Sequence, residues 1–128
     1  ALIIGNNAYH ELPERMQLTS PKNDATDVAA ALKRLGYPLV YDAAFTDASR
    51  ETMTAGQRVV CRLSKAHEVS ISYYGGHGIQ MGDEHCILQV NTEIDRPLYK
   101  KNRATLQRGR IIIHDCRDNP FSTQLDHA

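Results

Sequence analysis

The fold of this chain is indicated most clearly by residues 69–78, which read Val-Ser-Ile-Ser-Tyr-Tyr-Gly-Gly-His-Gly. The first six of these residues are rich in β-branched and aromatic side chains, which favour a strand. Gly75 and Gly76 then indicate that the strand ends abruptly in a loop that carries His77. The sequence therefore predicts a buried strand that delivers a histidine to the edge of a sheet.

Other segments repeat this strand pattern and alternate with helices. Apolar runs predict strands over residues 2–4, 38–45, 86–90 and 111–113. Helical spacing predicts helices over 23–35, with Asn23 or Asp24 as the cap and Gly36 as the stop, and over 49–66. Residues 91–109 are polar and hold at most a short helix over 99–107.

The order of these elements predicts an α/β fold. Strand, helix, strand, helix, strand, insertion and strand follow one another, and right-handed crossovers then give a mostly parallel sheet with helices on both faces. Residues 2–4 are expected to form a central strand. At 128 residues and 41% hydrophobic content, the chain is expected to hold one domain over 1–128.

Composition narrows the class of partner. Fifteen Lys and Arg balance fifteen Asp and Glu, and their even dispersion gives no basic face for nucleic acid or an anionic membrane. No apolar run has the length of a membrane span, and no signal peptide is recognisable. Three cysteines in dissimilar contexts favour reduced thiols and a cytoplasmic location. Peptides and small molecules remain as candidate partners.

Two polar segments follow predicted strands and carry reactive side chains. His77 follows the strand over 69–74, and Cys116 follows the strand over 111–113. If these strands are parallel neighbours, both side chains reach one edge of the sheet, where ligands bind in such folds. An imidazole can accept the proton of a thiol and later donate it to a leaving amine, so the pair is a candidate for nucleophilic catalysis.

Three plainer interpretations stand beside this one. His77 can be an ordinary hydrogen-bonding residue of a glycine-rich turn, and Cys116 an inert core thiol. A zinc site could draw ligands from His77, His85, Cys86 and either His114 or Cys116, but the chain has no paired-cysteine or HExxH spacing. Residues 5–7, Gly-Asn-Asn, lack the glycine pattern that cradles a phosphate, which argues against a nucleotide-binding domain.

Four motifs in order make nearly the whole chain resemble the large-subunit region of the caspase-like cysteine peptidases, closest to the paracaspase and metacaspase branch. The motifs lie at residues 2–9 (Leu-Ile-Ile-Gly-Asn-Asn-Ala-Tyr), at 23–25 (Asn-Asp-Ala) with 32–37 of the helix that follows, at 73–78 (Tyr-Tyr-Gly-Gly-His-Gly) and at 116–121 (Cys-Arg-Asp-Asn-Pro-Phe). The small-subunit part of such a peptidase is not in this sequence.

The resemblance implies specific roles. Cys116 would be the nucleophile and His77 the general base and acid, while Gly78 and Cys116 would supply oxyanion-hole N–H groups. Asp24 would lie in the pocket for the residue before the scissile bond, typically Arg or Lys, with a helix cap as its other interpretation. Metacaspases often need calcium, but the nearest acids here, Asp83 and Glu84, are too few oxygen ligands for a tight site, so we predict no cofactor and no required metal. The expected partner is a peptide or protein substrate, and a second copy of the chain is a further candidate because relatives are commonly activated by dimerisation or self-cleavage.

The sequence departs from the pattern of these relatives ahead of the nucleophile. Their acidic residue usually lies two positions before the cysteine, whereas His114 occupies that position here and Asp115 is adjacent to Cys116. On an extended strand this shift changes the face, which puts basic specificity in doubt. His114 and Asp115 are therefore the candidate substrate-binding residues beside Asp24. The alternative to an endopeptidase is a caspase-like interaction or scaffold domain without activity.

Overall fold

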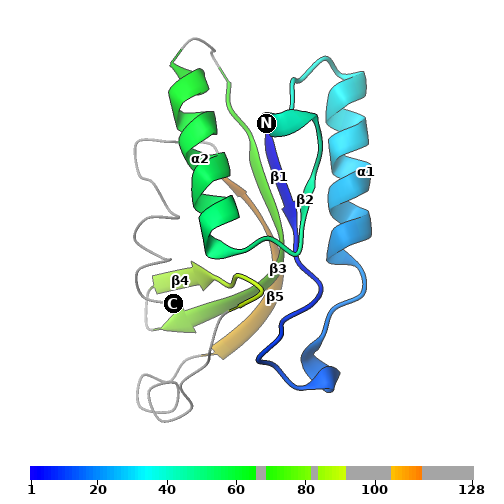
Figure 1. Ribbon diagram of the computed structural model, residues 1–128, viewed down its shortest axis with the longest axis vertical. Coiled ribbons are helices and arrows are strands. Elements are labelled where there is room, and N and C mark those ends of the chain that lie inside the picture. Colours follow the sequence, from blue (N-terminus) through cyan, green and yellow to red (C-terminus); the bar gives the residue numbers. More distant parts are fainter. Residues whose placement is uncertain (66–68, 82–83, 92–104, 114–128) are drawn as a thin grey trace.

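The computed structural model describes residues 1–65, 69–81, 84–91 and 105–113. It has an α/β architecture in which strands and helices alternate through the first half of the chain (Figure 1). The elements are β1 (Leu2–Gly5), α1 (Pro21–Arg34), β2 (Phe45–Thr46), α2 (Arg50–Ser64), β3 (Ser72–Met81), β4 (Glu84–Ile87) and β5 (Thr105–Ile113), with short 3-10 turns at Glu14–Met16 and Val40–Asp42. The predicted fold class is confirmed.

The sheet is built around β1 and β3. β1 lies between β2 and β3 and is parallel to both, with Ile4 opposite Phe45 on one side and Tyr74 on the other. The prediction that residues 2–4 form a central strand is therefore confirmed. β4 pairs antiparallel with the second half of β3, and β5 pairs antiparallel with β3 along its whole length. β5 occupies the edge of β3 opposite to β1, because residues 72–75 pair with both strands.

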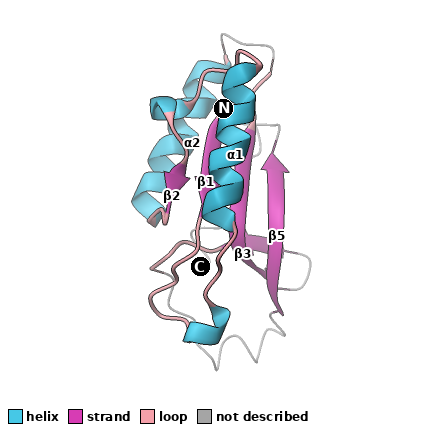
Figure 2. Cartoon of the chain, turned by 90° about the vertical axis from the view of Figure 1, so that its right-hand side faces the viewer, coloured by secondary structure: helices cyan, strands magenta, loops and turns pink. Residues whose placement is uncertain are grey.

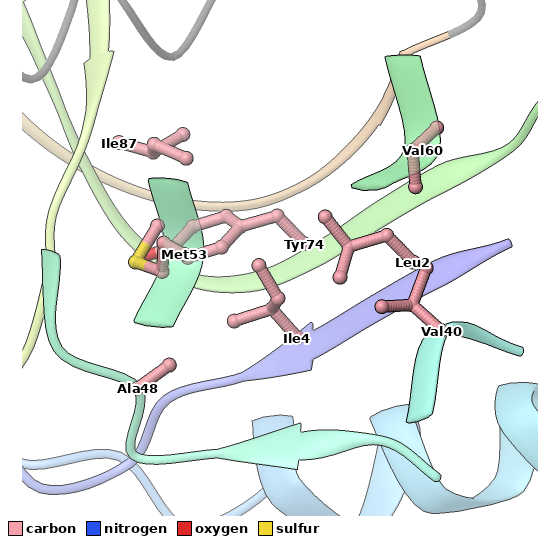
Figure 3. Close-up of a cluster of buried hydrophobic side chains, with 8 residues drawn as sticks. All are labelled: Leu2, Ile4, Val40, Ala48, Met53, Val60, Tyr74 and Ile87. Atoms are coloured by element: carbon pink, nitrogen blue, oxygen red, sulfur yellow. The ribbon is translucent and has the colours of Figure 1, made fainter. Parts of the chain in front are cut away.

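The two helices cover opposite faces of the sheet, as the sequence predicts (Figure 2). Alternate residues of β1 point to opposite faces, so Leu2 and Ile4 pack on the α2 side and Ile3 packs on the α1 side. Figure 3 shows the larger cluster between the sheet and α2. Its buried members are Leu2, Ile4, Val40, Ala48, Met53, Val60, Tyr74 and Ile87.

α1 begins earlier than predicted, but Gly36 terminates it as the sequence predicts. The helix begins at Pro21, whose fixed φ and missing N–H suit the first helical position, so Asn23 and Asp24 lie inside it and neither is the cap. At the other end Gly36 adopts a φ of 85°, and the N–H groups of Gly36 and Tyr37 donate to Lys33 O and Leu32 O. This left-handed termination requires the glycine that the sequence provides.

α2 agrees closely with the predicted helix. It spans Arg50–Ser64, and the Ser49 hydroxyl accepts a hydrogen bond from Thr52 N–H at 3.3 Å. Gly56 does not break it, because this residue is buried where the helix meets the sheet and a Cβ there would lie 2.8 Å from Leu2 Cδ1. The glycine allows close approach of helix and strand.

Three predicted elements are wrong in detail. Of the strand expected over 38–45 only Phe45 is in a strand, because Tyr41 and Asp42 have φ angles of 54° and 62° that no extended strand can hold. The strand expected over 86–90 lies earlier, at Glu84–Ile87. The short helix expected over 99–107 is a strand from Thr105 onward, where cross-strand pairing with β3 outweighs local propensity.

Candidate active site

His77 lies within a strand and not in a loop. β3 runs through both glycines to Met81, so the predicted strand end at Gly75 is wrong. The glycines have a packing role instead: a Cβ on Gly76 would collide with the hydroxyl groups of Tyr9 and Tyr74. His77 is consequently almost fully buried, with 1% of its surface exposed.

The imidazole of His77 is oriented by a backbone carbonyl. Its Nε2 lies 2.6 Å from the carbonyl oxygen of Met16. Because a carbonyl oxygen only accepts, Nε2 carries the hydrogen in the neutral ring, and Nδ1 is then the nitrogen with a free lone pair. Nδ1 is buried and has no hydrogen-bond partner within the described part of the chain. The lone pair of His77 Nδ1 can therefore accept a proton.

The segment that follows β1 carries Met16 to the imidazole. Residues 14–16 form a 3-10 turn, and the apolar side chains of Leu12, Met16 and Leu18 pack against buried Tyr9 and Leu88. Sequence reasoning missed Met16 because its contribution is a carbonyl group that every residue possesses. Only the path of the loop selects it.

Two buried tyrosines hold the backbone of His77. His77 N–H donates to Tyr9 Oη at 2.7 Å, Tyr9 Oη lies 3.0 Å from Tyr74 Oη, and Tyr74 Oη lies 2.6 Å from Leu88 O and 2.8 Å from His77 O. Since both carbonyls only accept, the hydrogens run in one direction, from His77 N–H through Tyr9 to Tyr74 and on to a carbonyl. This chain of hydrogen bonds fixes Tyr9, Tyr74 and the carbonyl groups around the backbone of His77.

Burial keeps the Tyr9 and Tyr74 hydroxyls in the neutral form that can donate these hydrogen bonds. It raises the pKa of Tyr9, and it raises the pKa of Tyr74 well above its ordinary value. The ring of Tyr9 also packs against the imidazole, with centroids 4.8 Å apart and an angle of 55° between the planes. Tyr9 thus supports His77 through both its hydroxyl group and its ring.

Asp47 fastens the loop after β1 to the start of α1. Its carboxylate accepts from Asn7 N–H at 2.8 Å and Ala8 N–H at 3.0 Å, and it pairs with Lys22 Nζ at 2.7 Å. Burial acts to raise the pKa of Asp47, but the Ala8 N–H, the Lys22 ammonium and the Asn7 N–H together outweigh it and lower the pKa. Asp47 therefore stays ionised and holds the two segments together.

Asp24 lies at the same end of the sheet as His77. It belongs to the first turn of α1, which begins beside β3: the missing Cβ of Gly75 would lie 3.5 Å from Pro21 Cβ. The cap interpretation of Asp24 is wrong, because α1 begins three residues earlier. The substrate-pocket role remains a prediction.

The other predicted site residues are placed less completely. Cys116, Asp115 and His114 lie outside the described residues. Gly78 is in β3, opposite Ile87 of β4 and Gln107 of β5, and its oxyanion-hole role remains a prediction.

The direction of β5 differs from the expectation that two parallel strand ends would meet. β5 is the neighbour of β3, but it is antiparallel, so its last residue Ile113 is opposite Ser72 at the start of β3. His77 is opposite Arg108 instead. The end of β5 at Ile113 therefore does not meet the end of β3 that carries His77, contrary to the prediction.

The described residues contain neither a metal-type cluster nor a membrane-spanning helix. No group of three or more His, Cys, Asp or Glu side chains gathers there as a metal would require. No helix in those residues combines the length and the apolar character needed to cross a bilayer.

The chain was compared with models of known protein families. The model of the caspase domain matches residues 1–127. The chain belongs to the caspase domain family. Membership of this family indicates a cysteine-peptidase-like role and agrees with the α/β fold of the described residues. No curated protein and no solved structure matched this caspase domain.

Proposed function

We propose that this caspase domain is the large-subunit region of a cysteine endopeptidase in which Cys116 is the nucleophile and His77 the general base. One observation carries the proposal. His77 Nε2 is engaged by Met16 O, which leaves Nδ1 buried with its lone pair unused by the described residues. An imidazole held in this way accepts a proton at one defined nitrogen.

The reaction follows from this arrangement. The proton of the Cys116 thiol passes to His77 Nδ1, and the thiolate sulfur forms a bond to the carbonyl carbon of the scissile peptide. The carbon–nitrogen bond then breaks, and Nδ1 returns the proton to the leaving amine, which leaves a thioester on Cys116. Water attacks this thioester with His77 again as base, and the thiol is regenerated.

The imidazolium formed in the first step keeps its bond to Met16 O. A carbonyl oxygen 2.6 Å from Nε2 stabilises the positive ring more than the neutral one, because the hydrogen bond becomes charge-assisted. Met16 thus takes the orienting place that an acidic side chain has in other triads. N–H groups of Gly78 and Cys116 would bind the oxyanion of the tetrahedral intermediate.

We further propose cleavage after Arg or Lys, with Asp24 as the pocket acid and His114 and Asp115 as neighbouring contacts. The position of Asp24 at the start of α1, on the same end of the sheet as His77, supports this assignment. A carboxylate there attracts a cationic side chain. The substrate is accordingly a peptide or protein with a basic residue before the scissile bond, and a homodimer is the proposed assembly to test.

One observation favours the alternative, an inactive caspase-like scaffold. The antiparallel pairing of β5 leads the chain toward the amino end of β3, whereas His77 lies in its second half. A dyad needs a sulfur within about 3–4 Å of Nδ1. The two functions therefore differ in whether a substrate-like electrophile reacts at Cys116.

The decisive experiment treats the intact protein with peptide substrates and a peptide electrophile. Substrates end in Arg, Lys or Asp at the cleavage position, and the variants are Cys116→Ala and His77→Ala, with Cys61→Ala and His10→Ala as matched controls. Cys61 is a partly buried cysteine of α2 outside the site, and His10 is an exposed imidazole. We expect turnover and labelling to vanish in the first pair and to persist in the controls.

Two results would contradict these proposals separately. Labelling that survives in Cys116→Ala, or turnover absent from the wild-type protein, would support the scaffold instead. Preference for Asp over Arg would overturn only the role of Asp24.

A further inference from the structure

The side-chain amide of Gln17 makes three hydrogen bonds to the segment that precedes it. Its Oε1 accepts from Tyr9 N–H at 2.6 Å, and its Nε2 donates to Tyr9 O at 2.7 Å and Leu12 O at 2.9 Å. We propose that Gln17 is a positioning residue for His77, acting through the carbonyl of Met16. This inference rests on the proposed role of His77 as base.

The peptide bond between Met16 and Gln17 transmits the effect. This unit is planar, and its N–H and C=O groups point in opposite directions in the trans form. Gln17 N–H donates to Glu14 O at 3.0 Å, which fixes one side of the plane. The Met16 carbonyl must then point the other way, toward His77 Nε2. The side chain of Gln17 anchors the same plane to residues 9–12.

Gln17 also joins the two supports of the imidazole. Tyr9 contacts the ring on one side and accepts from the backbone N–H of His77, while Met16 O holds Nε2. Both main-chain groups of Tyr9 are bound by the Gln17 amide. The Gln17 amide therefore anchors both supports, beside the bond from Leu12 N–H to Tyr9 O at 3.0 Å, and its loss would loosen both.

Only a side chain with one acceptor and two donors satisfies this position. Glutamate at neutral pH accepts but cannot donate, so Gln17→Glu keeps the bond from Tyr9 N–H and sets a carboxylate against Tyr9 O and Leu12 O. Gln17→Met has a similar length, removes all three bonds and adds no charge. The two variants disturb the position by different means, which separates the loss of the bonds from the effect of a new charge.

Gln57→Glu is the matched control. Gln57 is buried in α2, where its amide contacts Ser72 Oγ at 3.3 Å and Cys61 Sγ at 3.5 Å. The same substitution there perturbs the core on the other side of the sheet from α1. A general loss of stability would appear in all variants, whereas loss of His77 positioning would appear only at Gln17.

The test measures the His77 ring directly and then its catalysis. Proton NMR of the intact protein in a Cys116→Ala background observes the imidazole without turnover. The buried Nε2–H bonded to Met16 O is expected as a slowly exchanging downfield signal in the wild-type and Gln57→Glu forms. We expect its exchange to speed up at least tenfold in Gln17→Glu and Gln17→Met.

With Cys116 present, kcat should fall about tenfold in both Gln17 variants, equivalent to about 1.4 kcal/mol, with KM within twofold of wild type. An unchanged Nε2–H signal in folded Gln17→Met would overturn the inference. If the signal changes as expected but the wild-type protein has no turnover, the positioning role stands and the peptidase assignment fails.

Discussion

Removing the hydroxyl group of Tyr9 isolates the link between the tyrosine pair and His77. In Tyr9→Phe the ring remains to pack against the imidazole, but His77 N–H loses the acceptor that lies 2.7 Å away. Leaving a buried donor without a partner costs about 1–3 kcal/mol. We expect Tyr9→Phe to lower the free energy of unfolding by about 2 kcal/mol.

Tyr74→Phe is the matched comparison, because it removes a hydroxyl group of the same kind from the same chain of hydrogen bonds. The carbonyls that it serves keep other donors: Leu88 N–H remains 2.9 Å from His77 O, and Asn6 Nδ2 remains 3.4 Å from Leu88 O. Tyr9 O–H, however, loses the acceptor to which it donates, so the expected loss is about as large, again about 2 kcal/mol. The double variant should lose less than the sum, with a coupling of at least about 0.5 kcal/mol.

Urea unfolding of the intact protein, followed by far-ultraviolet circular dichroism, measures all three losses. The slope of the free energy against urea concentration should be unchanged, since these substitutions do not alter the surface exposed on unfolding. A loss below about 0.5 kcal/mol in either single variant would refute the assigned direction of the hydrogen bonds.

Two further predictions concern the surroundings of the site. Gly5→Ala should lower the free energy of unfolding by about 3 kcal/mol or more, because the added Cβ would collide with the backbone carbonyl of Pro21. Thermal unfolding of Gly36→Ala is the comparison, because a Cβ there meets no atom and only the positive φ opposes it. Equal losses in the two variants would contradict the role of packing at Gly5. The lowered pKa of Asp47 means that its carboxylate stabilises the fold above the unfolded-state pKa of about 3.8 and that this contribution is lost as pH falls below it. The free energy of unfolding, measured from pH 6 to pH 2.5, should therefore depend less on pH in Asp47→Asn than in the wild-type protein. Asparagine tolerates the φ of 50° at this position. An identical pH profile in the two proteins would show that the contacts with Lys22 and Ala8 do not stabilise the ionised carboxylate.

Much of the fold follows from local patterns in the sequence. The apolar run at residues 2–4 is central because only a strand covered on both faces tolerates apolar side chains on both. The stop of α1 at Gly36 was predictable because it depends on one residue and its neighbours. Family membership agrees with the motifs at the start of the chain and around His77 and Cys116.

Elements that depend on distant contacts could not be predicted. The extent of β3 was underestimated because Gly75 and Gly76 resemble a loop in sequence, whereas they face Tyr9 and Tyr74 hydroxyls and the first turn of α1 in the fold. The direction of β5 was also misjudged, because an apolar run carries no information on strand polarity. Pairing partners decide both features.

By itself, the sequence determined the α/β class, the family and the choice of His77 and Cys116 as candidate catalytic residues, because these depend on the identity and order of side chains. Tertiary structure alone decided which nitrogen of His77 is engaged, since the partner is the main-chain carbonyl of Met16 and any residue could supply that group. The same holds for the support from Tyr9 and Gln17, which lie about 60 positions or more before His77 in the chain and reach it only because β1 and β3 are neighbours.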